Sequence, residues 1–302
     1  MNAVSEPKFS SSQILFFLVG FCLIGSFLGN LLIMVILHFN QLDLSTILQN
    51  FNENSTLAEK KYLVNILAIN HLSTFLIPGL ILAPFVYGAD WTTIVTLQKP
   101  KKASFFLLGA LWLLISYPLV EWLYKINRMI PLPGWLNQIE DSTNEMVISL
   151  LGSGDWWLLL MNIFVMGLLP AIGEELVFRG LVQPNMIKWV KKPYLGILLT
   201  AAIFSAIHMQ FQGFIPRMGL GFVLGLLAYW SKNLWAPILA HFCNNALQVC
   251  LFYIVKKYNI DVDLNNNLEF PVYILIISLL LVLIIGWYFY RKQRDLEKVI
   301  KA

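Results

Sequence analysis

The chain has 302 residues, of which 58% are hydrophobic and 13% are charged, and its mean hydropathy is +0.69. A soluble domain of this size would be about half apolar and about a quarter charged, so the composition excludes an ordinary soluble protein and favours a bundle of membrane helices. The net charge of +4 is too small to indicate a nucleic-acid partner, and we expect the lipid bilayer to surround the chain.

Eight segments are apolar over roughly the 20 residues that a helix needs to cross a bilayer. The first segment is too long for the core of a signal peptide, so we interpret it as a retained helix. The sequence therefore predicts an all-α, multi-pass transmembrane helix bundle of about eight spans. The predicted spans are 13–38, 63–88, 104–124, 156–178, 194–210, 216–230, 235–255 and 271–290.

The distribution of basic residues predicts the orientation of these spans, because Lys and Arg are enriched in short cytoplasmic loops. If both termini are cytoplasmic, 14 of the 21 Lys and Arg residues fall on the cytoplasmic side and 7 fall outside. We therefore expect an integral, multi-pass membrane protein with both termini in the cytoplasm. Nothing in the chain indicates a eukaryotic source, so a bacterial inner membrane is the expected location.

A long connector lies between the third and fourth predicted spans. Residues 129–154 begin with a proline turn and continue as a helix whose apolar residues include Trp135, Ile139 and Met146. Such a helix can lie along the outer membrane surface. It can equally pack on the bundle as a connector, and both interpretations stay open.

The fourth span ends in GEELVFRG, residues 173–180, which places three charged side chains in lipid. An ionisable group within a span is costly, so it is expected to have a partner, to face protein or water, and to mark a function. Glu175 and Arg179 are four residues apart, share a helix face and can form an ion pair. Glu174 is rotated by about 100° from Glu175 and can point elsewhere.

Two later spans carry further polar residues at a similar depth. His208 lies in FSAIH at 204–208, and His241 and Asn245 lie one turn apart in HFCNN at 241–245. With straight helices measured from the basic clusters, Glu174 lies about 21 Å deep, His208 about 24 Å, and His241 and Asn245 about 14 and 20 Å. Four side chains from three helices are therefore predicted to converge on one layer.

Two other ionisable side chains fall outside this predicted site. His71, in the second span, has no second motif beside it, so we interpret it as a structural hydrogen-bonder. Glu121 lies beside Trp122 near the end of the third span, where headgroups begin, and we interpret it as a solvated carboxylate.

The four converging side chains suit the hydrolysis of an acyl bond. A carboxylate beside a histidine can take a proton from water as a general base. A second histidine and an amide can stabilise an oxyanion. One glutamate with two histidines is also a common zinc-binding set with an open fourth position. The residues alone leave both schemes open.

The motifs EExxxR, FxxxH and HxxxN are all present, in this order, as EELVFR at 174–179, FSAIH at 204–208 and HFCNN at 241–245. Together they resemble the CPBP (ABI) family of intramembrane proteases, which contains the type II CAAX prenyl endopeptidases and bacteriocin-processing and immunity proteins. The resemblance covers residues 155–255 and implies a catalytic helix bundle there. The remaining parts are then an N-terminal three-span region with the outer connector (1–154) and a C-terminal span with a basic cytoplasmic tail (256–302).

The resemblance also implies an activity and residue roles. It implies an intramembrane endopeptidase that cleaves a membrane-associated, CAAX-like or other peptide precursor. Glu174 with His208 would activate the attacking water, while His241 and Asn245 would stabilise the oxyanion. The residues that would hold the helix and tune Glu174 are Glu175 and Arg179.

We expect this chemistry to need no cofactor, because a zinc site would leave Asn245 without a role. The alternative is a zinc ion held by Glu174, His208 and His241. A different functional class is a non-proteolytic membrane scaffold or bacteriocin-immunity protein of the same fold. A transporter would also explain charged groups in the middle of the membrane.

Overall fold

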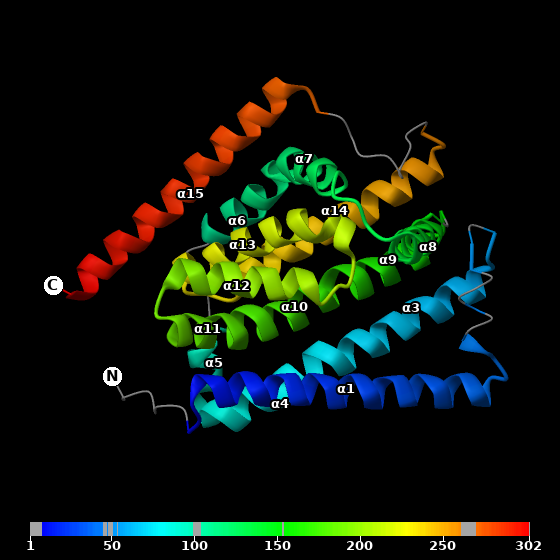
Figure 1. The fold of residues 1–302 in the computed structure, drawn as a ribbon, viewed down its shortest axis with the longest axis horizontal. Helices are drawn as coiled ribbons and strands as arrows, with labels where there is room; N and C mark the ends of the chain where they lie inside the picture. Colours follow the sequence, from blue (N-terminus) through cyan, green and yellow to red (C-terminus); the bar gives the residue numbers. More distant parts are fainter. Residues whose placement is uncertain are drawn as a thin grey trace.

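The computed structural model describes residues 8–44, 47, 51–52, 54–98, 104–152, 154–260 and 270–301. Within these residues every regular element is a helix (Figure 1). All eight predicted spans are helical, so the expected all-α membrane bundle is confirmed. Lys99, Lys101 and Lys102, which contribute to the predicted charge asymmetry, lie outside the described residues.

Six helical stretches of the described chain are long and apolar enough to cross a membrane. The helices α6 and α7 form a further span if the pair, which is bent by 40°, counts as one. The one remaining predicted span, 194–210, contains α12, whose 14 residues reach about 21 Å, less than the thickness of the hydrocarbon core. The protein is therefore an integral, multi-pass membrane protein.

The N-terminal region contains two long helical stretches. The first is α1 (Ser11–Phe39), and the second runs from Leu57 to Ile94 with short changes of helix type. Each begins at a capping box, in which Ser10 pairs with Gln13 and Thr56 with Glu59. The second stretch comprises α3 (Leu57–His71), the π-helical η1 (Leu72–Leu76), α4 (Ile77–Tyr87), the 3₁₀ turn η2 (Gly88–Asp90) and α5 (Trp91–Ile94).

The middle of the chain joins this region to the motif-bearing helices. The helices α6 (Ser104–Ile115) and α7 (Tyr117–Asn127) meet at Ser116, and Pro118 is the second residue of α7. The connector predicted at 129–154 contains α8 (Gly134–Leu151). It packs on the bundle through the buried Glu140, while Trp135 and Ile139 remain exposed.

The motif-bearing helices follow in one continuous stretch, from Trp156 to Val190, and then in three separate helices. The stretch comprises α9 (Trp156–Asn162), the π-helical η3 (Ile163–Leu168), α10 (Leu169–Glu175), the π-helical η4 (Leu176–Val182) and α11 (Gln183–Val190). The later elements are α12 (Pro193–Ala206), the 3₁₀ turn η5 (Phe211–Gly213), α13 (Phe214–Ser231), α14 (Trp235–Lys257) and, after the motifs, α15 (Val272–Lys301).

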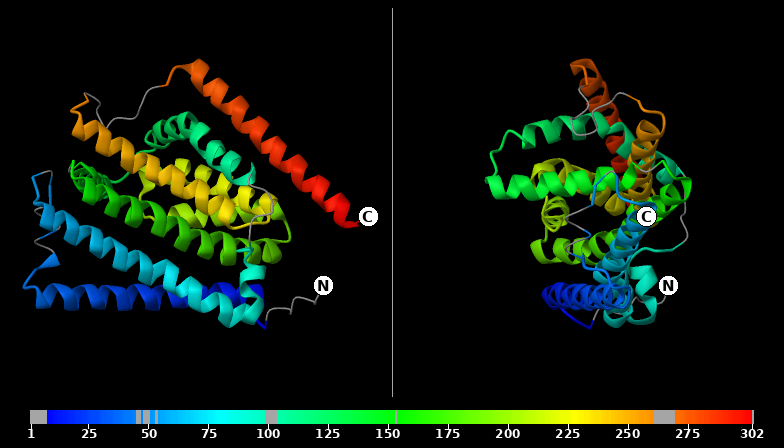
Figure 2. Two further views of the ribbon diagram at one scale, coloured as in Figure 1. Left: turned by 180° about the vertical axis from the view of Figure 1, so that it is seen from behind. Right: turned by 90° about the vertical axis from the view of Figure 1, so that its right-hand side faces the viewer.

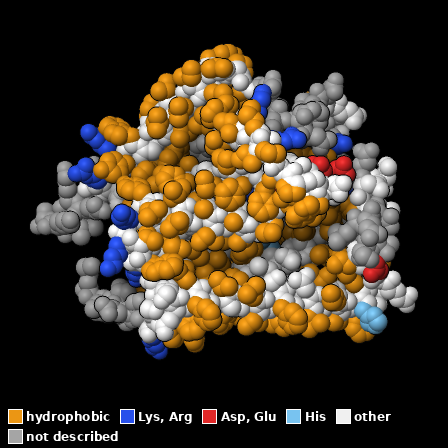
Figure 3. All heavy atoms as spheres, viewed as in Figure 1, with side chains coloured by type: hydrophobic (Ala, Val, Ile, Leu, Met, Phe, Trp, Pro, Cys, Tyr) orange, Lys and Arg blue, Asp and Glu red, His pale blue; other side chains and the backbone are white. Residues whose placement is uncertain are grey.

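The helices are arranged in layers that place the motif-bearing ones in the centre. Helix α1 and the stretch from α3 to α5 lie side by side on one flank, and α15 lies on the opposite flank (Figure 2). The start of α1 and the end of α15 lie at the same end of the molecule (Figure 1). On the face drawn in Figure 3, most Lys and Arg side chains lie toward that end, the Asp and Glu side chains lie toward the other, and hydrophobic side chains cover the flank between.

Candidate active site

The glutamates of the EExxxR motif lie on α10, between two π-helical segments. The segment η3 ends at Leu168, directly before α10, and η4 begins at Leu176, directly after Glu175. A π segment accommodates an extra residue in the turn and is frequent at functional sites, because it changes the direction in which the flanking side chains point. Both glutamates are buried, with 6% exposure for Glu174 and 0% for Glu175.

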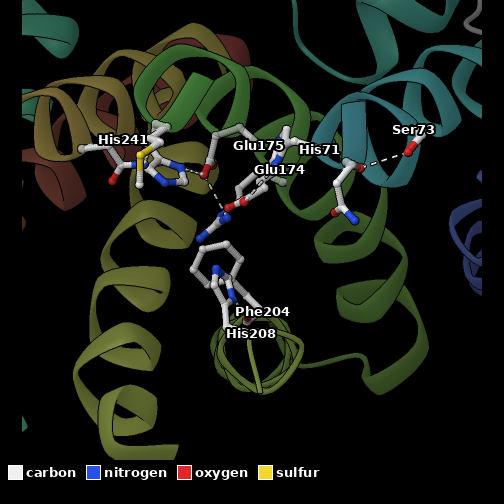
Figure 4. Close-up of polar contacts among 11 residues, drawn as sticks. His71, Ser73, Glu174, Glu175, Phe204, His208 and His241 are labelled. Atoms are coloured by element: carbon white, nitrogen blue, oxygen red, sulfur yellow. Dashed lines mark hydrogen bonds and ion pairs between the residues drawn. The ribbon is translucent and has the colours of Figure 1, made fainter. Parts of the chain in front are cut away.

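The Glu175 carboxylate has two side-chain partners, Arg179 and His241. Its Oε1 accepts a hydrogen bond from the Arg179 guanidinium at 2.9 Å, so the ion pair predicted from the spacing of these residues is present. The Nδ1 atom of His241 lies 2.8 Å from the same oxygen. Because His241 is on α14, this carboxylate ties the first motif to the third (Figure 4).

Arg179 connects the first motif to the second. Its guanidinium donates to the carbonyl of Gly221 on α13 at 3.1 Å and lies over the Phe204 ring, 4.7 Å from the ring centre. The Phe204 ring also contacts the rings of His208 and His241. The phenylalanine of the FxxxH motif therefore lies among three of the predicted site residues.

Glu174 has a different environment from its neighbour. Its Oε1 lies 3.9 Å from Nδ1 of His71, which is longer than a hydrogen bond but within ion-pair range. His71 is the last residue of α3 and so belongs to the N-terminal region. The sequence predicts a structural role for this histidine, whereas the structure places it beside the site. The sequence feature that could have indicated a role in the site was the position of His71 within a predicted membrane span, but no second motif lies beside it.

His208 lies in the turn after α12, where its Nδ1 is 2.8 Å from the carbonyl oxygen of Phe204. The segment that follows is held by α8, because both carboxylate oxygens of the buried Glu140 accept backbone N–H groups, from Phe211 at 2.6 Å and from Gln212 at 3.0 Å. Asn127 of α7 also donates to the carbonyl of Phe211. The position of His208 thus depends on residues that the motifs do not include.

Asn245, the last residue of the HxxxN motif, donates from Nδ2 to the carbonyl oxygen of Met166 at 3.3 Å. Four residues after Met166 is Pro170, which has no N–H to donate to that carbonyl. The amide therefore satisfies an acceptor that the proline leaves open. Since an amide nitrogen has two hydrogens, this bond leaves a second one that can face a ligand.

The side chains do not form a metal-binding set as they stand. Within the described residues, no group of three or more His, Cys, Asp or Glu side chains is arranged so that it could hold a metal ion. His241 directs Nδ1 to Glu175, and His208 directs Nδ1 to a backbone carbonyl, so Nε2 of each ring is left to face a ligand. The grouping of Glu174, His208 and His241 that the zinc alternative requires is therefore not present among the described residues.

Comparison with known proteins identifies the segment that carries these residues. Residues 155–247 match the family model described as type II CAAX prenyl endopeptidase Rce1-like. The uncharacterized protein YpbD of Bacillus subtilis (strain 168) is 32% identical over 93 residues, which cover 30% of this chain and 44% of that protein. The chain thus spans less than half the length of this curated relative, and no solved structure matches. The resemblance predicted from the motifs is confirmed, because residues 155–247 are similar to the Rce1-like family of type II CAAX prenyl endopeptidases.

Proposed function

We propose that this protein is an intramembrane endopeptidase that uses Glu174 to activate water for the hydrolysis of a peptide bond. The observation that carries the proposal is the contrast between two adjacent glutamates. Glu175 is fully buried and bound to Arg179 and His241, whereas Glu174 makes none of these bonds. Two carboxyl groups in such different environments are suited to different tasks, one structural and one chemical.

In the proposed reaction, Glu174 takes a proton from water while the water oxygen attacks the carbonyl carbon of the substrate. The tetrahedral intermediate then breaks at the C–N bond, and the proton held by Glu174 passes to the leaving amine. His208, whose ring contacts that of Phe204, would help to hold the attacking water. The protein residues thereby return to their starting state after each cleavage.

His241 and Asn245 would stabilise the oxyanion of that intermediate. Glu175 engages Nδ1 of His241, which orients the ring so that Nε2 is the nitrogen available to the substrate. Asn245 would contribute the amide hydrogen that is not directed to Met166.

The proposed substrate is a membrane-associated or CAAX-like peptide or protein precursor, since the site lies inside a bundle covered by hydrophobic side chains (Figure 3). We further propose that the start of α1 and the end of α15 face the cytoplasm of a bacterial cell, in agreement with the side on which the basic residues gather. The competing proposal is a scaffold or immunity protein in which the same residues only hold the fold.

The experiment compares the ends of membrane peptides and proteins in cells that carry the wild-type chain, Glu174→Gln, or Glu145→Gln. Glu145 lies on α8 and is exposed, so it serves as a matched control for the change of Glu to Gln. We expect peptide termini that are present with the wild type and with Glu145→Gln and absent with Glu174→Gln. If cells with a correctly folded Glu174→Gln protein contain the same peptide termini as cells with the wild type, the protease proposal is wrong and the scaffold is favoured.

A further inference from the structure

His71 lies outside the family segment and still approaches the proposed catalytic base. Its Nδ1 atom is 3.9 Å from Oε1 of Glu174, and the two side chains are 13% and 8% exposed (Figure 4). An imidazole and a carboxylate enclosed together in this way interact more strongly than they would in water, because little solvent screens them. The N-terminal region therefore supplies a polar group to a site that the motifs place between residues 174 and 245.

The other ring nitrogen of His71 indicates that stability does not explain this placement. Within the described residues, Nε2 is buried and makes no hydrogen bond. A buried polar atom without a partner costs about 1–3 kcal/mol. An apolar side chain of similar size would avoid that cost, so the histidine is better explained by the polar groups of α10 that its ring faces, the Glu174 carboxylate and the Leu169 carbonyl.

The first residue of GEELVFRG provides the room that the His71 ring needs. A Cβ atom added at Gly173 would lie 3.1 Å from Nε2 of His71 and 3.3 Å from Cβ of Leu76, both of which are tight contacts. Any larger residue at this position would push the ring or the neighbouring turn away from α10. The glycine before Glu174 thus allows His71 to approach that carboxylate.

The backbone around His71 is also tightly packed. The π-helical η1 starts at the next residue, and its Ser73 lies so close to α1 that a Cβ atom added at Gly25 or Gly29 would overlap it. The ring of Phe75 contacts the His71 ring, with 5.1 Å between their centres. These contacts leave the imidazole few alternative positions.

We infer that His71 is a positioning residue, whose imidazole orients the Glu174 carboxylate so that one oxygen faces His71 and the other faces the attacking water. This inference rests on the proposed function and adds to it a residue from the N-terminal region. The distance of 3.9 Å shortens to a hydrogen bond when substrate fills the site, since catalytic hydrogen bonds are often long in the free enzyme.

The test uses the purified 302-residue protein in liposomes. The substrate is a synthetic peptide that contains the bond whose cleavage in cells is most reduced by Glu174→Gln. The variants are His71→Phe, which removes both nitrogens, and His71→Asn, whose amide can donate from a place close to Nδ1. The matched control is His38→Phe, because His38 is exposed near the end of α1. Rates are normalised to folded, monodisperse protein.

We expect His71→Phe to lower kcat by about 10- to 100-fold, which is the usual effect of removing a group that orients a ligand or base, and to leave KM unchanged. His71→Asn should retain more of the rate than His71→Phe, and His38→Phe should match the wild type. A residue needed only for stability would reduce the amount of folded protein and not kcat of the part that folds.

A second variant keeps the inference testable if His71→Phe does not fold. Gly173→Ala should lower kcat by displacing the imidazole, and the same change should have little further effect when it is made together with His71→Asn. If Glu174→Gln abolishes cleavage while folded His71 and Gly173 variants keep the wild-type kcat, the role of His71 is wrong and the proposed function stands. If no cleavage depends on Glu174, both are wrong.

Discussion

The central and outer helices of this bundle are held in place by different interactions. In the stretch from Trp156 to Val190, 39% of the residues of an 18-residue apolar segment are buried, compared with 11% in α1 and 17% in Val272–Arg294 of α15. The central stretch is fixed by charged groups, such as the Arg179 guanidinium, which contacts two other helices, α12 and α13. The outer helices face lipid with rows of hydrophobic side chains, such as Phe16, Leu23 and Phe27 on α1.

This difference follows from the solvent. Lipid tails are as apolar as leucine, so burying one more apolar side chain between membrane helices contributes little. Association then depends on close packing of small residues and on polar bonds between helices. Helix α1 uses the first means, through Gly25 and Gly29, and the motif-bearing helices use the second. The chemistry proposed for Glu174 lies where the polar bonds are concentrated.

The largest expected effect on stability is that of Glu175→Gln. The change removes the negative charge that both Arg179 and His241 face, and it leaves a buried guanidinium without compensation. Removing one partner of a buried ion pair costs about 3–5 kcal/mol. Unfolding in a mild detergent, followed by tryptophan fluorescence, should show this loss. Glu174→Gln, which removes no hydrogen-bonded charge pair and leaves no guanidinium uncompensated, is the matched control, and equal losses in the two variants would contradict the contrast between the glutamates.

A smaller loss is expected when a side chain is added between α1 and η1. Gly25→Ala should destabilise the protein by about 1–3 kcal/mol, because the new methyl group overlaps the backbone of Ser73 and forces the helices apart. Gly20→Ala on the same helix has no atom within 4 Å of the added carbon and should leave stability unchanged. Thermal unfolding of the two variants measures the difference. If they unfold alike, α1 is not held by close contact at Gly25.

The next prediction concerns the turn that carries His208. Glu140→Ala leaves the backbone N–H groups of Phe211 and Gln212 without acceptors, at a cost of about 1–3 kcal/mol for a buried group. Amide hydrogen exchange in residues 207–213 should accelerate, and cleavage should fall even though Glu140 is far along the chain from every motif. The exposed neighbour provides the control, since Asp141→Ala should change neither. Unchanged exchange in the turn would show that α8 does not hold it.

The smallest expected effect is that of metal removal. Because the side chains of Glu174, His208 and His241 do not form a ligand set here, a chelator such as 1,10-phenanthroline should leave cleavage unchanged. Elemental analysis of the active protein gives an independent measurement. One zinc per chain whose removal abolishes cleavage and whose return restores it would assign these three residues as ligands instead.

Much of the fold could be predicted from the sequence, because long apolar segments in lipid have few alternatives to a helix. The ion pair of Glu175 and Arg179 followed from spacing alone, since residues four apart share a helix face. The bend between α6 and α7 was not predicted. Hydropathy reports whether a segment prefers lipid, and it does not report where a helix ends or bends within that segment.

The details of the candidate site were harder to predict. The π segments η3 and η4 change the register of the helix by a residue, and their composition does not differ from that of the α-helix around them. The spacing of residues along an ideal helix therefore could not predict that His241 would face Glu175. His71 and Glu140 come from regions without a motif, and only the packing of whole helices brings them to the site.

The most direct test of the role of Glu174 is the source of the oxygen in the cleaved product. Wild-type protein in liposomes should cleave the synthetic peptide in H₂¹⁸O and place one ¹⁸O atom in the new carboxyl group. Because a carboxylate that serves as general base accounts for about 10²–10⁴-fold in rate, folded Glu174→Gln should form this product at least about 100-fold more slowly, while Glu145→Gln forms it at the wild-type rate. Cleavage by folded Glu174→Gln at the wild-type rate would contradict the assignment of Glu174 as the base.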